Sequence, residues 1–305
     1  MAETNTHIIS IVLLKKFGDK HKQIVVSDKD KGITYLERVK DIAFAEHTKL
    51  IEEAERKWHQ TETHVISAYK KLREGKLLES PFHTDVIKNL IAVHYVRCFP
   101  FYAIKHRFEE EMFHKINLNV IKKLGRPLTI EEKEWGAGEW LQKVEETTPK
   151  IFISTFEKVF DLVSRTGLEV GVAPDGAEFL IGDTPVVTIG EKGKMGIMQG
   201  VTIDIASGVG MPLSPQHMVA LKKDAKETRY TTLNVRQVNA ANEKQVRQAL
   251  RFYCYKPAGI NDKTNVSSNV ALIIDFFVSL IFYILTVFIM QSATRSVFRP
   301  SLSPV

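Results

Sequence analysis

An unbroken apolar segment near the C-terminus, residues 270–290, constrains most strongly what this chain can fold into. Fifteen of its 21 residues are Val, Leu, Ile or Phe, and Asp275 is its only charged residue. A helix needs roughly 20 apolar residues to cross about 30 Å of hydrocarbon. Fifteen side chains at about −0.3 to −0.6 kcal/mol each outweigh one Asp at about +3 kcal/mol. We therefore expect a transmembrane helix over 270–290; the alternative is a buried helix of a soluble protein.

The rest of the chain divides around this segment. Residues 1–255 have the composition of a soluble domain, residues 256–269 form a polar tether, and residues 291–305 form a short tail. The apolar run Ile8–Leu14 is too short for a secretory signal, and Lys15 and Lys16 follow it rather than precede it. We expect a tail-anchored, single-pass protein with its soluble domain in the cytoplasm. Three basic residues before the segment and two after it agree with this orientation: Arg251, Lys256 and Lys263, then Arg295 and Arg299.

Charge and cysteine content exclude several classes of protein. The net charge is +6, of which residues 256–305 supply +2, so the soluble part carries +4. This mild charge gives no strong signal for a nucleic-acid partner. Cys98 and Cys254 are the only cysteines, which is too few for a disulfide framework or a zinc site. A reducing compartment is the simplest location.

The pattern of the first 255 residues predicts an α+β domain in four blocks: N-terminal short strands, a central helical block, an antiparallel sheet and a closing helix. Short strands are expected over His7–Phe17, Ile24–Ser27 and Ile33–Leu36, because these apolar runs are separated by polar turns. Five further short runs after Gly167 predict the antiparallel sheet: Leu168–Ala173, Glu178–Gly182, Val186–Gly190, Val201–Ile205 and His217–Lys222. Helical spacing over Asn234–Phe252 predicts the closing helix.

Capping residues and prolines divide the helical block. Helical spacing begins at Glu37, and Thr61 could cap a second helix. Ser80 and Pro81 begin a long helix that Pro100 must kink or end. Spacing then continues to Leu124, where Gly125 and Pro127 stop it. Thr129 and Glu132 form a capping box for the next helix, and Thr148-Pro149 begins another, Ile151–Ser164.

Several landmarks in this order resemble an uncharacterised bacterial and fungal family, domain of unknown function four-two-three-eight. They are His7–Phe17, Leu90–Arg97, Phe179–Val186, Met211–Pro215 and the segment that begins at Leu233. The resemblance covers about residues 7–253, with the C-terminal apolar segment added to it. Ser10 stands where the family usually has proline, and Cys98-Phe99 replaces a small residue and proline. The resemblance implies a domain boundary but brings no established activity.

Four polar residues are candidates for a site. Asp183 follows a predicted strand within Gly-Asp-Thr-Pro, where it could bind a metal, act as a base, or fix the turn by accepting backbone N–H bonds. Glu62 lies in the first turn of its predicted helix, where a carboxylate complements the helix dipole. Arg97 shares a helix face with His94 and could form a buried ion pair or an anion-binding fork. His7 opens the first family-like motif and could pair with Ser214.

No motif in the sequence indicates a particular reaction. His59 and His64 lie on different helix faces, and no metal-binding spacing of His and Cys is present, so a metal or other cofactor stays unknown. Ser214 is not part of a Gly-x-Ser-x-Gly elbow, and the glycine-rich stretch 190–200 lacks the Lys-Ser/Thr pair of a phosphate-binding loop.

Two hypotheses remain, and whether the chain is an enzyme stays open between them. The first is a tail-anchored sensing or binding protein at the membrane, with a stress or phage-defence effector as its more specific form, whose partners are the bilayer and other copies through the transmembrane helix. In the second, His7, Glu62, Arg97 and Asp183 converge in a membrane-tethered, metal-dependent hydrolase resembling a nuclease.

Overall fold

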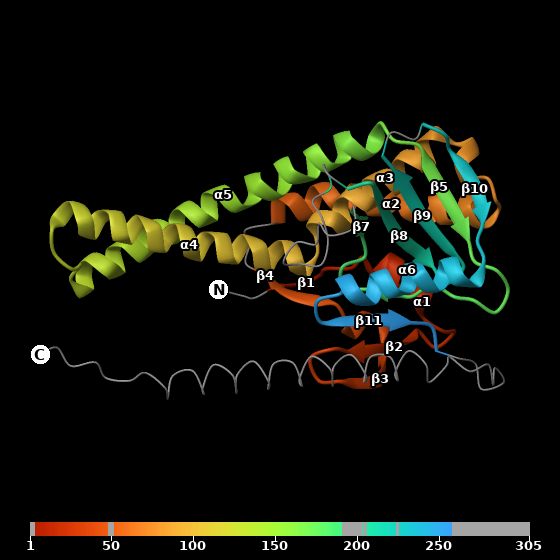
Figure 1. Ribbon diagram of the computed structural model, residues 1–305, viewed down its shortest axis with the longest axis horizontal. Coiled ribbons are helices and arrows are strands. Elements are labelled where there is room, and N and C mark those ends of the chain that lie inside the picture. Colours follow the sequence, from red (N-terminus) through yellow and green to blue (C-terminus); the bar gives the residue numbers. More distant parts are fainter. Residues whose placement is uncertain (1–3, 48–51, 191–202, 204–205, 224–225, 258–305) are drawn as a thin grey trace, which may run out of the picture. The chain divides into compact units, whose positions relative to one another are not determined.

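In the computed structural model, the described part of the chain comprises residues 4–47, 52–190, 203, 206–223 and 226–257. It has an α+β fold with three sheets and a group of long helices (Figure 1), which confirms the predicted fold class. The expected transmembrane segment 270–290 lies outside the described residues, as do most of its tether and its tail. Within the described residues, no helix combines the length and the apolar character needed to cross a membrane.

The largest sheet has five strands in the order β10-β5-β9-β8-β7. These strands are β5 (Leu168–Val172), β7 (Val187–Ile189), β8 (Gly208–Ser214), β9 (His217–Lys222) and β10 (Arg229–Thr232). Its pairs are antiparallel, as predicted, except that β10 runs parallel to β5, and the predicted strand Glu178–Gly182 lies in another sheet, where only Ile181–Gly182 is strand. The predicted strand Val201–Ile205 falls almost entirely outside the described residues.

A second sheet has four strands in the order β3-β2-β11-β6, which are β2 (Gln23–Asp28), β3 (Ile33–Arg38), β6 (Ile181–Gly182) and β11 (Phe252–Tyr255). The closing helix α6 (Val235–Gln248) begins at a capping box of Asn234 and Gln237 and contacts β6. The prediction that this helix continues to Phe252 was wrong. The helix ends at Gln248, and Phe252 is instead the first residue of β11, whose backbone is satisfied by β2 and β6 on either side.

The N-terminal segment differs most from the prediction. The run expected as strand over His7–Phe17 is β1 (Thr4–His7) followed by the helix α1 (Ile11–Phe17). Leu13, Leu14 and Phe17 of α1 are buried together, which is the spacing of one helix face. The helix expected from Glu37 does not begin there. The chain instead completes β3, makes a 3₁₀ turn and forms β4 (Phe44–His47), which pairs with β1.

The central block consists of α2 (Glu52–Arg73), α3 (Pro81–Val96), α4 (Phe99–Leu124) and α5 (Ile130–Ser164). The predicted boundaries at Ser80-Pro81, Gly125 and Thr129 are confirmed, and Pro100 lies in the first turn of α4. Two predicted boundaries were wrong. Thr61 lies inside α2, so Glu62 is not in a first helical turn, and α5 continues through Pro149.

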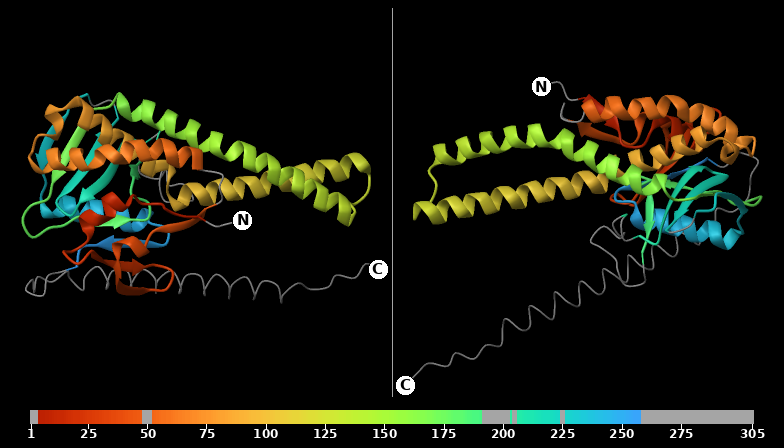
Figure 2. Two further views of the ribbon diagram at one scale, coloured as in Figure 1. Left: turned by 180° about the vertical axis from the view of Figure 1, so that it is seen from behind. Right: turned by 90° about the horizontal axis from the view of Figure 1, so that it is seen from above.

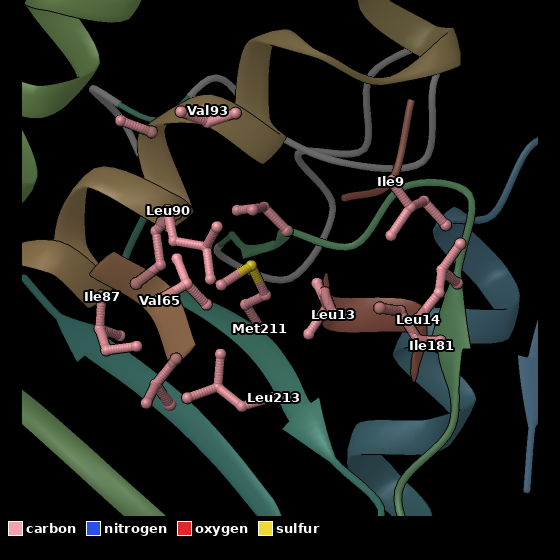
Figure 3. Packing of buried hydrophobic residues seen from close by; sticks show 14 of the residues in the cluster. Ile9, Leu13, Leu14, Val65, Ile87, Leu90, Val93, Ile181, Met211 and Leu213 are labelled. Atoms are coloured by element: carbon pink, nitrogen blue, oxygen red, sulfur yellow. The ribbon is translucent and has the colours of Figure 1, made fainter. Parts of the chain in front are cut away.

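The hydrophobic core lies between the helices and the five-stranded sheet (Figure 3). Leu13 of α1, Val65 of α2 and Leu90 of α3 approach Met211 and Leu213 of β8. These three helices therefore share one core. Polar residues from the start of α1, from α2 and from the end of α3 meet beside it. That meeting point brings together the candidate residues described next.

Candidate functional site

Arg97, which caps the C-terminal end of α3, is the centre of a buried polar cluster. Only 3 % of its surface is exposed. Its Nη1 donates to Oε2 of Glu55 at 3.0 Å, and its Nη2 donates to Oγ of Ser10 at 2.6 Å and to Oε1 of Glu62. Glu55 and Glu62 lie seven residues apart on α2, so they project from one face of that helix. One guanidinium thus joins the start of α1, the middle of α2 and the end of α3.

His94 is fully buried beside Arg97 and is held as a neutral ring. Its Nε2 accepts the backbone N–H of Ser10 at 3.0 Å, while its Nδ1 lies 2.9 Å from the carbonyl oxygen of Leu90. Because a carbonyl only accepts, the proton must be on Nδ1. Burial, together with the charge of Arg97, lowers the pKa of His94 to about 4. His94 therefore fixes the backbone at Ser10 rather than supplying a charge.

The two carboxylates differ in their electrostatic environments. Burial raises the pKa of Glu55 above its usual value, although Arg97 opposes this shift. For Glu62 burial acts in the same direction, but the charge of Arg97 and hydrogen bonds from Ser10 and Arg97 lower the pKa below its usual value. Glu62 therefore stays ionised, and paired with Arg97, over a wider range of pH than Glu55 does.

Two aromatic rings complete the surroundings of Arg97. The Trp58 ring lies with its centroid 5.8 Å from Cζ of Arg97, a distance at which cation–π attraction operates. The indole Nε1 of Trp58 is buried with no hydrogen-bond partner among the described residues. His7 places its Nδ1 3.1 Å from the carbonyl oxygen of Ile42, and burial and then the charge of Arg97 lower its pKa. His7 is therefore within electrostatic range of the cluster.

Asp183 has a different environment. Its carboxylate accepts the backbone N–H groups of Leu250 at 2.7 Å, Arg251 at 2.6 Å and Phe252 at 3.3 Å. Burial raises its pKa, although these three hydrogen bonds oppose the shift. The charge of Lys29 also acts on this carboxylate. Asp183 thus connects the end of β6 to the backbone that enters β11, rather than fixing its own Gly-Asp-Thr-Pro turn.

The structure therefore joins Glu62 and Arg97 directly, places His7 where their charges act on its pKa, and gives Asp183 other partners. Sequence reasoning missed Ser10, Glu55 and Trp58 as members of the cluster. The available signals were the seven-residue spacing of Glu55 and Glu62, and the presence of Ser10 where the family-like motif has proline. Ser214 pairs with His217, not with His7, across the turn between β8 and β9 at 3.0 Å.

A comparison with known protein families identifies the chain. Residues 5–258 match the model of the family described as Protein of unknown function (DUF4238). The chain belongs to the DUF4238 family. No curated protein and no solved structure matches it significantly.

In this DUF4238 domain the inner part of the central cluster is closed to bulk solvent, whereas the side chains of Glu55 and Glu62 keep 22 % and 18 % of their surface exposed. Ser10 is 2 % exposed and His94 is 0 % exposed. No group of three or more His, Cys, Asp or Glu side chains among the described residues is arranged to hold a metal ion. A separate surface pocket of about 380 Å³ lies over α2, α3 and α5. It is lined by Lys57, Gln60, Thr61, His64, Phe82, Asp85, Val86, Asn89 and Phe156.

Proposed function

We propose that this DUF4238 protein is a membrane-anchored binding protein whose α+β domain senses or captures a partner at the cytoplasmic face of the bilayer. The observation that carries the binding role is that Ser10, His94 and Arg97 are buried and that the polar groups around Arg97, with the partly exposed Glu55 and Glu62, are directed at one another. Such a network holds α1, α2 and α3 in one arrangement, because loss of one member leaves the others unpaired in a low dielectric. It suits a scaffold better than a site that substrate must reach.

The membrane location is supported by the apolar segment 270–290, whose single charge lies near one end. Introducing Ile281→Lys and Leu285→Lys together adds about 5 to 7 kcal/mol to the cost of insertion. We expect the full-length chain to sediment with membranes and to resist carbonate extraction, and this double variant to move to the supernatant. Ser267→Lys with Ser268→Lys in the tether adds the same charge outside the segment and is the matched control. A wild-type chain that stays in the supernatant would refute the anchor.

A more specific version of this function is a stress or phage-defence effector that perturbs the bilayer through its associated membrane segments. Expression of the full-length chain should then lower membrane potential and slow growth, and the Ile281→Lys, Leu285→Lys variant should do neither. Unchanged potential and growth on expression of the wild-type chain count against the effector role. That result leaves the binding role in place.

The second candidate function is a membrane-tethered, metal-dependent hydrolase acting on nucleic acid. One observation favours it: Arg97 and Glu62 pair, and Oγ of Ser10 donates to the Glu62 carboxylate, as a hydroxyl nucleophile would to a base, with His7 in electrostatic range. The test is hydrolysis of DNA and RNA with Mg²⁺ or Mn²⁺ added. Activity that Glu62→Gln abolishes, and that the exposed control Glu157→Gln retains, would make the hydrolase the better description.

A further inference from the structure

The helices α4 and α5 extend from the sheets as a two-helix arm (Figure 1 and Figure 2). Between residues 109 and 147, all of which the structure describes, no residue is buried. The arm nevertheless carries several large apolar side chains with at least 38 % of their surface exposed: Ile116, Leu118, Val120, Leu124, Ile130, Trp135 and Leu141. Each helix of a two-helix arm buries only the side that faces its partner. A second line of apolar side chains on the same helix therefore stays exposed to solvent.

The two stripes of α4 can be separated. Phe113, Asn117 and Ile121 are half-buried, and the Phe113 ring lies 5.9 Å from the ring of Trp140 on α5. This stripe faces α5. The other stripe contains Ile116, which is 40 % exposed and lies roughly 60° around the helix from Phe113 at 3.6 residues per turn. It is an apolar face beside the α4–α5 contact.

The sequence along this second stripe is symmetric. It reads Glu109, Met112, Ile116, Val120 and Lys123, with spacings of three, four, four and three residues. If a second α4 lies antiparallel and centred on Ile116, Glu109 faces Lys123 of that copy and Met112 faces its Val120. Ile116 then faces its own equivalent on the two-fold axis. Glu109 and Lys123 lie roughly 21 Å apart along the helix at 1.5 Å per residue. Opposite charges therefore meet at both ends of the contact.

We infer that the arm is a self-association surface, on which α4 of one copy packs antiparallel against α4 of a second copy. The contact is isologous, as expected of a two-fold dimer, and has an apolar centre with an ion pair at each end. A parallel arrangement is disfavoured, because it would place Glu109 against Glu109 and Lys123 against Lys123. The inference does not rest on the membrane anchor, although confinement to a membrane would raise the effective concentration of the arms.

Charge reversal tests the antiparallel order directly in the purified full-length chain in detergent. Glu109→Lys and Lys123→Glu, each alone, place like charges opposite each other. Each should weaken self-association about tenfold in sedimentation velocity, since like-charge pairs penalise the contact. The double variant Glu109→Lys, Lys123→Glu exchanges the charges and should restore the wild-type dimer. Association through the segment 270–290 alone would leave all four proteins equal, which would overturn the inference without affecting the anchor.

Cross-linking provides a second measurement that does not depend on the charged variants. Ile116→Cys puts two thiols at the predicted two-fold axis, whereas Leu118→Cys puts them on roughly the opposite side of α4. Cys98 and Cys254 are buried, so a short bismaleimide should react with the introduced thiol. We expect dimer formation with Ile116→Cys and little with Leu118→Cys. Equal yields, or no wild-type dimer in sedimentation, would show that this face has another partner or none.

Discussion

His94 should make the stability of this domain fall as the solution is acidified. Its pKa is about 4 in the folded chain against an ordinary value of 6.5, because burial and Arg97 oppose a charge on the ring. A group whose pKa is lowered by folding contributes fully above its unfolded pKa, and that contribution is lost as the pH falls towards its folded pKa. The window for His94 is therefore pH 6.5 down to about 4. Linkage between these values gives a loss of about 2 kcal/mol by pH 5, on the scale of 1.36 kcal/mol per pKa unit.

The measurement is urea unfolding of the full-length chain in detergent at pH 7.5 and pH 5, followed by tryptophan fluorescence. His94→Gln keeps an acceptor for the Ser10 N–H but cannot be protonated in this range. Its loss of stability between the two pH values should be smaller than that of the wild type by about 2 kcal/mol. Glu55, Glu62 and His7 titrate in both proteins, so their contributions cancel apart from the part that comes from the interaction of His94 with Glu62.

The exposed residue His21 provides the matched control, and His21→Gln should behave as wild type. If His94→Gln loses as much stability as the wild type between pH 7.5 and pH 5, the neutral, buried state assigned to His94 is wrong. A different baseline stability of the variant does not affect this result, since only the change with pH is compared.

Three substitutions test the remaining contacts by urea unfolding. Ser10→Pro should lower the free energy of unfolding by about 1–3 kcal/mol more than Ser10→Ala, because only proline removes the backbone N–H that donates to His94. Equal losses in the two variants would contradict this. Asp183→Ala should lower the free energy of unfolding by about 3 kcal/mol, because three backbone N–H groups at the start of β11 lose their acceptor; a loss below about 1 kcal/mol would contradict this role. Arg97→Met should cost about 3–5 kcal/mol by leaving Glu55 and Glu62 without their cation, and a near-neutral effect would contradict it.

The sequence predicted those boundaries that depend on residues acting locally. Pro81 at a helix start, Gly125 in the left-handed conformation at a helix end, and the Thr129 capping box each act within one turn. The incorrect predictions fall where contacts between residues far apart in the sequence determine the local structure. The apolar run to Phe17 fits either a strand or a short helix, and burial against β8 selects the helix. The closing helix ends at Gln248 rather than at Phe252, because Phe252 begins the strand that pairs with β2.

The candidate site was only partly predictable for the same reason. Helical spacing could place His94 and Arg97 on one face, but nothing local indicates that α2 presents two carboxylates to that face. Asp183 shows the opposite case. Its local motif, Gly-Asp-Thr-Pro, suits either a catalytic acid or a turn, and the choice depends on the chain about 67 residues further on. A polar residue at a strand end is therefore weak evidence for chemistry until its hydrogen-bond partners are known.

Ser10, which stands where the family-like motif has proline, takes part in the buried cluster through both its backbone N–H and its hydroxyl. Its backbone φ of −50° is one that proline also adopts, so replacing proline with serine needs no change of fold there. Serine adds an N–H and a hydroxyl, and both are used, by His94 and by Glu62 and Arg97. With proline at this position, Nε2 of His94 would have no N–H to accept and Arg97 would lose one acceptor. The neutral His94, the anionic Glu62 and Ser10 therefore form one interdependent set, and substitutions within it should not be additive.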